Sequence, residues 1–197
     1  MKKDKKSMEI LFVDKGPTLY YNGRGDFMKD VIKKAAASVA YFRLPRYHEI
    51  PNVGLYLEQT GLYINEYLEP VLPECLTGSM ISNYVKKGLI ASPTKKQYSR
   101  EQIAYLFFIA VAKQVLSLDA LQTFIRVQQR SYSLETAYNY FVAEFENQLQ
   151  YCFELKASPE QVGTDELSNE KRLLYSCIGS VTQKIYLEKC LQILAKE

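Results

Sequence analysis

Five basic side chains fall in one stretch of the chain that contains no acidic residue. The stretch runs between Glu74 and Glu101, and its cations are Lys86, Lys87, Lys95, Lys96 and Arg100. It carries a charge of +5, and because the whole chain carries +3, the rest of the chain sums to −2. Lysine and arginine neutralise phosphate groups, so one basic block in an otherwise slightly acidic chain indicates a surface that faces a polyanion.

A short amphipathic helix is expected at the start of this block, because Thr77 is a favourable N-cap and Gly88 a C-terminal stop. At helical spacing, Ile81, Tyr84 and Val85 share the packing face. The opposite face presents hydroxyl, amide and ammonium groups, which can bind phosphates or, for asparagine, pair with adenine. We therefore predict DNA contacts from eight residues: Ser79, Ser82, Asn83, Lys86, Lys87, Lys95, Lys96 and Arg100.

The residues after Gly88 are too few for another helix and suit a small basic loop or hairpin at about 92–98. Ser99 then opens a helix with a capping box to Gln102. This helix is apolar nearly all round, so we expect it to be the most buried one. Tyr84 and Tyr98 could stack on bases, but we favour packing roles for both.

Other kinds of chemistry find little support in the sequence. His48 is the single histidine and is expected at the surface; an ordered ligand in a polar pocket that contains this histidine would revive an enzymatic role. The four cysteines, Cys75, Cys152, Cys177 and Cys190, show no CxxC spacing and are expected to be reduced and mostly buried. We therefore predict no catalytic residue, no metal and no cofactor.

Low glycine and proline content favours long helices, and we predict an all-α, mainly helical fold. Residues 7–25 are expected to be irregular or weakly stranded, and 43–51 to form a linker. Helices are expected at about 26–42, from an Asn52 cap to 68, at 77–88, from Ser99, at 117–130, at 133–156 and at 165–196.

The last two helices leave alternatives open. Aromatic residues of the first, among them Tyr138, Phe141 and Phe145, are expected in the core, with a dimer interface or a small-molecule pocket between the two helices as the sharper hypothesis. Glu144 and Glu146, two residues apart, are interpreted as solvating charges. The final helix has an apolar stripe broad enough to pack and also to offer an edge to a second protomer.

Two resemblances follow from these residues. The segment 81–90, then Pro93 and the segment 98–106, resembles the head of MerR-type regulators, with a recognition helix, a basic wing and a capped helix. The segments 50–59 and 76–84 resemble a bacterial family called domain of unknown function 1836, over roughly residues 43–130. The resemblances imply a winged helix-turn-helix head and dimerisation through C-terminal helices. Unlike MerR recognition helices, residues 80–84 contain no arginine.

We therefore predict a DNA-binding transcriptional regulator that acts as a homodimer on double-stranded DNA, with a recognition helix at about 78–87 and a wing at about 92–98. The expected division is an N-terminal extension (1–45), the head (46–130) and a C-terminal helical region (131–197). No targeting segment is visible and the longest apolar run is too short for a bilayer, so a cytoplasmic protein without a membrane partner is expected. A small-molecule effector is not identified. The alternative is a protein–protein interaction module that has kept the head but does not bind DNA.

Overall fold

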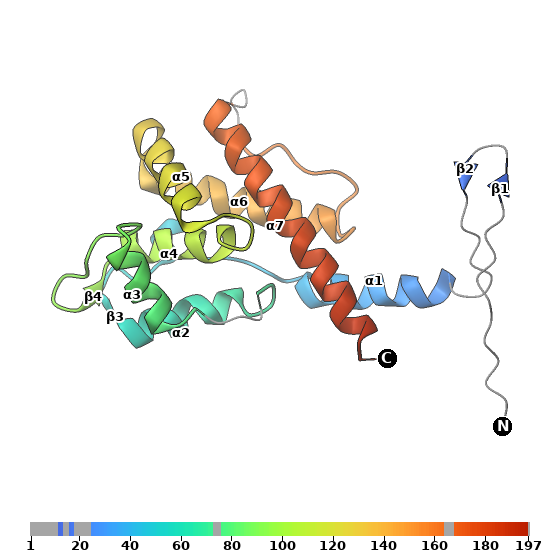
Figure 1. Ribbon diagram of the computed structural model, residues 1–197, viewed down its shortest axis with the longest axis horizontal. Helices are drawn as coiled ribbons and strands as arrows, with labels where there is room; N and C mark the ends of the chain where they lie inside the picture. Colours follow the sequence, from blue (N-terminus) through green and yellow to red (C-terminus); the bar gives the residue numbers. More distant parts are fainter. Residues whose placement is uncertain (1–11, 14–15, 18–24, 73–75, 164–167, 197) are drawn as a thin grey trace.

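A computed structural model describes residues 12–13, 16–17, 25–72, 76–163 and 168–196 of the protein. This part contains seven α-helices and two pairs of very short strands. Figure 1 shows their arrangement. The elements are β1 (Phe12–Val13), β2 (Gly16–Pro17), α1 (Gly25–Val39), a 3₁₀ turn (Tyr47–Glu49), β3 (Leu55–Tyr56), α2 (Leu57–Leu68), α3 (Gly78–Lys86), β4 (Gln97–Tyr98), α4 (Arg100–Ala112), α5 (Leu118–Ser131), α6 (Leu134–Cys152) and α7 (Asn169–Leu194). The predicted mainly helical class is confirmed. Most of the segment expected to be irregular, 7–25, lies outside the described residues.

Helix starts follow the predicted capping residues closely. The hydroxyls of Thr77, Ser99, Ser117 and Ser133 each accept a hydrogen bond from the backbone N–H three residues further on. These bonds satisfy donors that have no partner inside a helix. Gly88, with φ 71°, follows α3 in the left-handed conformation that glycine adopts without strain.

The start of α2 differs from the expectation of a helix capped by Asn52. Leu55 and Tyr56 pair instead, antiparallel, with Tyr98 and Gln97. Gly54 allows this approach, because a Cβ atom there would lie only 2.7 Å from the Cβ of Gln97. The helix therefore begins at Leu57, after the strand. Pairing with residues about forty positions later in the chain therefore outweighs the capping preference of Asn52.

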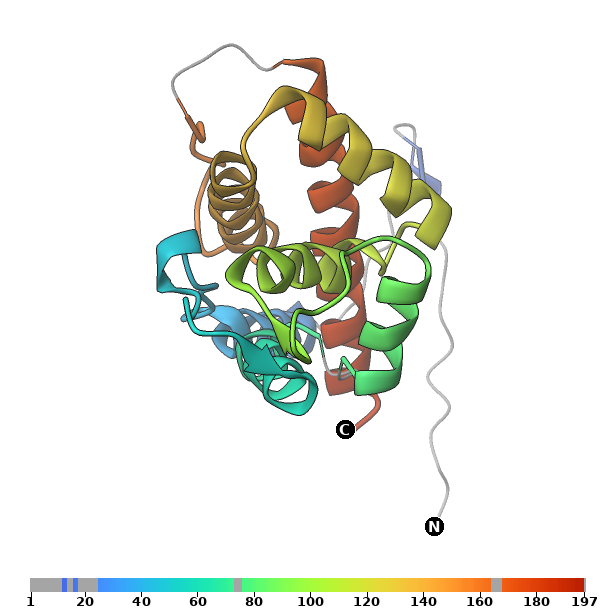
Figure 2. The ribbon, with the colours of Figure 1, turned by 90° about the vertical axis from the view of Figure 1, so that its left-hand side faces the viewer.

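One hydrophobic core runs through the described elements from Val31 to Cys190 and crosses all three predicted segments. Its centre is α4, on which Ile103, Leu106 and Phe107 are fully buried, and Figure 2 shows this helix enclosed by its neighbours. The Phe107 ring meets Tyr63 and Tyr67 of α2 edge-on and the Tyr138 ring of α6 at a tilt. The expectation that α4 is the most buried helix is confirmed, with nine buried residues.

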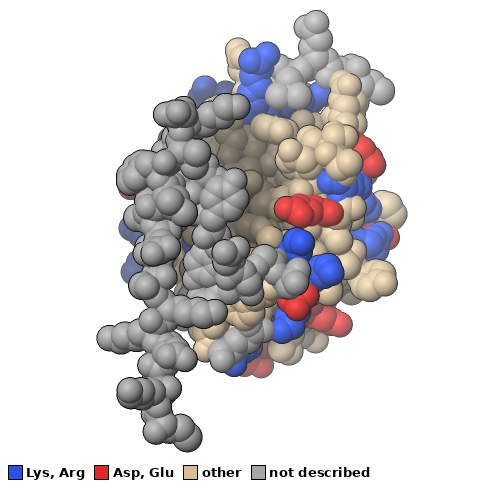
Figure 3. Space-filling model, turned by 90° about the vertical axis from the view of Figure 1, so that its right-hand side faces the viewer, with Lys and Arg blue, Asp and Glu red and all other residues tan. Residues whose placement is uncertain are grey.

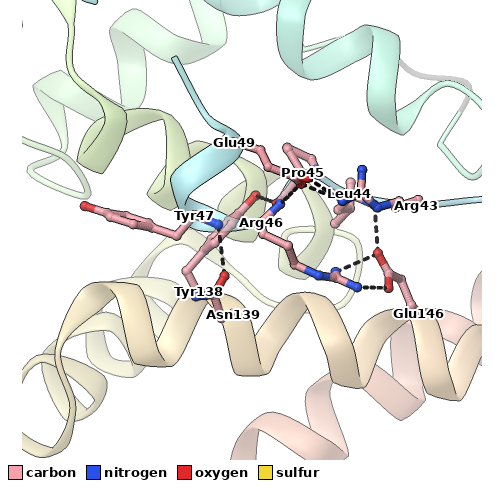
Figure 4. A network of polar contacts seen from close by, with 9 residues as sticks. All are labelled: Arg43, Leu44, Pro45, Arg46, Tyr47, Glu49, Tyr138, Asn139 and Glu146. Atoms are coloured by element: carbon pink, nitrogen blue, oxygen red, sulfur yellow. Dashed lines mark hydrogen bonds and ion pairs between the residues drawn. The ribbon is translucent and has the colours of Figure 1, made fainter. Parts of the chain in front are cut away.

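The segment between α1 and β3 lies tightly against α6, although we predicted it as a linker (Figure 4). The Arg46 guanidinium donates two hydrogen bonds to the Glu146 carboxylate, at 2.9 and 2.7 Å. The backbone N–H of Leu44 donates to the same carboxylate at 2.9 Å, and the Tyr138 hydroxyl donates to the Pro45 carbonyl at 3.0 Å. A carboxylate that accepts three bonds fixes this segment to α6.

The interpretation of Glu144 and Glu146 as solvating charges was wrong. Glu146 is partly buried in the ion pair just described. Glu144 is only 3% exposed, and it accepts a hydrogen bond from the Gln148 side chain at 2.7 Å. Burial raises the pKa of the Glu144 carboxyl, and the bond from Gln148 opposes that rise. Gln148 lies four residues after Glu144 on the same helix, but the partners of Glu146, Arg46 and Leu44, lie about one hundred residues earlier, so spacing along α6 cannot reveal them.

Three of the four cysteines lie in described residues, and all three are free. Cys177 and Cys190 are buried and Cys152 is half-buried, in agreement with the expectation of reduced, mostly buried thiols. Burial raises the pKa of Cys152 and of Cys177 to about 11. Thiols with such pKa values are poor nucleophiles at neutral pH. Cys75 lies outside the described residues.

Candidate nucleic-acid interface

α3 packs through one face and exposes the other. Ile81 and Tyr84 are buried against the core. The approach to the helix is fixed by Asn65 of α2, whose side chain donates to the Leu76 carbonyl at 3.1 Å and accepts from the Leu76 N–H at 2.7 Å. The polar face is open to solvent, as expected from its spacing: Ser79, Ser82, Asn83 and Lys86 are all exposed, as is Lys87 at the end of the helix.

A two-residue hairpin follows α3 and carries Lys95 and Lys96 at its tip. Thr94 and Gln97 exchange backbone hydrogen bonds of 3.1 and 2.9 Å around the two lysines. Both lysines are exposed, and both have positive φ angles, 51° and 65°. Positive φ at both central residues defines the type I′ turn, which matches strand twist and strongly prefers Asn-Gly.

The hairpin is anchored at its base and therefore projects from a fixed point beside α3. Tyr98 is 4% exposed and pairs with Leu55 of β3. The Gln102 side chain donates to the Ala91 carbonyl at 2.7 Å and so holds the other arm. Figure 1 shows β3 and β4 together at the same end of the molecule as α3. The packing roles that we favoured for Tyr84 and Tyr98 are confirmed by their burial.

Lysine at both tip positions is less stable than the Asn-Gly pair that this turn prefers. A side chain other than glycine in the left-handed region costs roughly 1–2 kcal/mol. Strained residues of this kind cluster at functional sites, where the side chain is needed for another purpose. Two ammonium groups held at an exposed, strained tip therefore indicate a negatively charged partner.

The four lysines of this surface are also unpaired. None of Lys86, Lys87, Lys95 and Lys96 forms an ion pair with an acidic side chain in the part of the chain that the structure describes. Elsewhere half-buried lysines do pair with carboxylates, as in Lys184–Glu188 at 2.6 Å. Figure 3 shows the far end of the molecule, where blue and red side chains intermingle. The positive charge of α3 and the hairpin is thus available to a ligand.

Arg100 differs from these exposed lysines, because its guanidinium is bound within the protein. It is half-buried at the start of α4, and its guanidinium donates to the carbonyls of Ile50 and His48 at 2.8 and 3.4 Å. The same group lies 5.7 Å from the centre of the Tyr47 ring. These contacts hold the segment before β3 in place. Nothing local in the sequence signals them, because the acceptors lie about fifty residues earlier.

One supporting residue was missed by the sequence analysis. The Gln122 side chain of α5 donates to the Lys87 carbonyl at 3.3 Å, at the C-terminal end of α3. A Cβ atom on Gly88 would lie 3.7 Å from the same amide nitrogen. α5 therefore braces the end of α3, a contact that becomes visible only once both helices are placed.

Alternative sites were also sought among the described residues. His48 is exposed, as expected. In that part of the chain, no group of three or more His, Cys, Asp or Glu side chains is placed to hold a metal ion. None of the described helices combines the length and the apolar character needed to cross a membrane.

Comparison with known proteins gives one family. Residues 45–141 match the family described as Domain of unknown function (DUF1836), so the chain contains a DUF1836 domain over that range. The predicted resemblance to this family is confirmed. The matched range contains α2, α3, the hairpin, α4, α5 and the start of α6, and with them all eight predicted DNA-contacting residues. No curated protein and no solved structure matches the chain.

Proposed function

We propose that the chain is a DNA-binding transcriptional regulator whose head is a winged helix-turn-helix similar to that of MerR-type regulators. α3 enters the major groove, where Ser79, Ser82 and Asn83 meet base edges and Lys86 meets a phosphate. The hairpin acts as the wing, and Lys95 and Lys96 contact the backbone beside the groove. The observation that carries the proposal is the unpaired lysine tip, held in a strained turn next to an exposed polar helix face.

The order of elements supports this assignment. A packing helix (α2), a short exposed helix (α3), a hairpin and a buried helix (α4) follow one another, and β4 returns to pair with β3 before α2. The lysines bind phosphate as point charges and give affinity rather than sequence preference. Asn83 is the side chain best suited to specify a base, since its amide can pair with adenine through two hydrogen bonds.

A homodimer is part of the proposal. On α7, Leu187 and Leu191 are 57% and 53% exposed and lie one turn apart on the helix. Apolar side chains exposed in this way can pack against a second protomer. A symmetric dimer reads two half-sites about 34 Å apart, or a multiple of that distance. Sedimentation equilibrium of the chain, compared with Leu187→Glu, tests this part; a monomeric parent chain contradicts it.

The test of DNA binding is selection from a random-sequence duplex pool at low salt, followed by a salt titration of the enriched duplex. We expect a palindromic site and a steep loss of affinity with salt. Asn83→Ala should relax the preference at one base position by about 1–3 kcal/mol. The matched control is Asn52→Ala, which alters an exposed asparagine outside α3. Equal losses on all sequences would exclude Asn83 from base reading.

A protein–protein interaction module is the second candidate. It is favoured by the absence of arginine from α3 and by three large apolar side chains exposed on the same domain, Val53, Tyr56 and Leu62. Aromatic and aliphatic side chains in the open are typical of protein contacts. This function predicts no DNA binding by the folded chain even at low salt, together with a stable heteromeric partner isolated from cells.

A further inference from the structure

A pocket of about 260 Å³ lies between α5, α6 and α7. Its walls include Phe124 and Val127 of α5, Ala137 and Tyr140 of α6, and Leu174 of α7. A smaller cavity of about 40 Å³ adjoins it on the inner side and shares Phe124, Ala137 and Leu174 with it. The space is thus lined mainly by aromatic and aliphatic groups and leads from the surface toward the core.

The pocket exists because α5 is only lightly packed. Of its fourteen residues, Leu121 and Ile125 alone are buried. Phe124 and Val127 are half-buried, although their apolar groups face inward to the pocket. The end of α5 is tied to the start of α7, because the Tyr132 hydroxyl and the Ser168 hydroxyl lie 3.0 Å apart. This contact links the C-terminal end of α5 to the start of α7 beside the pocket, since Tyr132 also lines it.

One polar group inside the pocket has capacity for a ligand. The Gln128 amide nitrogen donates to the Tyr132 carbonyl at 3.0 Å, which orients the side chain. Among the residues that the structure describes, the Gln128 amide oxygen receives a single long contact, 3.5 Å from the Tyr105 hydroxyl. A carbonyl oxygen has two lone pairs, so it can accept a further hydrogen bond from a bound molecule.

The size of the pocket bounds the ligand. A cavity of about 150 Å³ lined by apolar side chains accommodates benzene, so this one has room for two fused rings. Its lining also includes Glu170 and Lys171, whose opposite charges do not select a net charge, and the Lys171 ammonium lies 5.4 Å from the centre of the Tyr140 ring. Apolar pockets with a few placed polar groups are the usual form of small-molecule sites.

We propose that this pocket binds a planar aromatic molecule of one or two rings that carries a single hydrogen-bond donor, as a phenol or an indole does. The rings lie between Phe124 and Tyr140, and the donor meets the amide oxygen of Gln128. This inference goes beyond the proposed function and does not depend on it, since binding of the small molecule is measured without DNA.

The experiment titrates the full-length chain with naphthol, a bicyclic phenol, and follows its fluorescence. The chain contains no tryptophan, so the signal is free of that background. We expect saturable binding of one molecule per chain. Ala137→Phe places a ring in the space common to both cavities, and Val127→Phe fills part of the pocket from its α5 wall, so each should weaken binding by about tenfold or more. Val53→Phe, the same change at a residue 72% exposed outside the pocket, should leave binding unchanged.

A second readout separates the polar contact from the fold. Gln128→Leu should weaken naphthol by about tenfold, yet leave naphthalene, which has no donor, nearly unaffected. The ratio of the two affinities does not change if the variant is merely less stable. Absence of saturable naphthol binding, or unchanged binding by both phenylalanine variants, overturns the proposal. Displacement of naphthol by decanoate at lower concentration than by indole overturns the assigned ligand class.

Discussion

Replacement of the hairpin tip by Asn-Gly should stabilise the protein and, if the proposed function is correct, weaken its binding to DNA at the same time. In the variant Lys95→Asn/Lys96→Gly, the turn keeps its geometry, because Asn-Gly is the preferred pair where both φ angles are positive. Two unpaired ammonium groups are lost from the exposed tip. Stability and binding therefore move in opposite directions, which ordinary damage to the fold does not produce.

The magnitude follows from the two φ angles of 51° and 65°. Relief of left-handed strain gives roughly 1 kcal/mol at each position, and the greater freedom of glycine in the unfolded chain removes about 0.5–1 kcal/mol of that gain. The net gain is about 1 kcal/mol, which raises the melting temperature of a chain this long by about 2–4 °C. Loss of the two phosphate contacts proposed for these lysines should reduce the slope of log affinity against log salt by about 1.8.

Thermal denaturation followed by circular dichroism measures the first effect, and a salt titration with the selected duplex measures the second. Lys95→Gln/Lys96→Gln removes the charges but keeps the strain, so it should lose the same salt slope with no gain in melting temperature. Lys33→Gln/Lys196→Gln removes two exposed charges elsewhere and should change neither quantity. A lower melting temperature for the Asn-Gly variant would refute the strain argument, and an unchanged salt slope would refute the role of the hairpin as a wing.

Three further outcomes follow from the buried polar groups. Glu146→Ala should cost about 2 kcal/mol in urea denaturation, since it leaves the half-buried Arg46 guanidinium without its partner; a cost below about 0.5 kcal/mol would contradict that role. The raised pKa of Glu144 means that the folded state binds its proton more tightly than the unfolded state, so stability is lost as pH rises above the ordinary carboxylate range. Glu144→Gln should therefore melt higher than the parent near neutral pH and equally near about pH 4, and a difference independent of pH would exclude this cause. Because burial raises the pKa of Cys152 and Cys177 to about 11, their thiolate fractions fall on the order of 100-fold, and peptide mass spectrometry should find both unalkylated by iodoacetamide unless the chain is first denatured.

Local signals in the sequence were sufficient for most helix starts and for the face of α3. Capping at Thr77 and Ser99 involves residues only three positions apart, so the local sequence predicts it. The apolar spacing of Ile81 and Tyr84 likewise predicted which side of α3 packs. The same spacing predicted which residues of α3 are exposed, because residues on the side opposite the packing face must point to solvent.

Contacts between distant segments could not be predicted from one sequence. The start of α2 moved because Leu55 pairs with Tyr98, and Arg100 turned inward because its acceptors are the carbonyls of Ile50 and His48. The positive φ angles of Lys95 and Lys96 could not be predicted from the sequence either. Lysine carries no turn preference of its own, so only the closing hydrogen bonds between its neighbours establish the type of turn.

The ion pair that fixes the early segment to α6 sets an order of events during synthesis. Arg46 and Glu146 are separated by 100 residues, so a ribosome that adds about 5–20 residues per second needs roughly 5–20 s to deliver the second after the first. Throughout that interval Leu44, which is fully buried in the finished protein, has no helix α6 to cover it. The contacts that fix this segment against α6 can therefore form only after α6 has been synthesised.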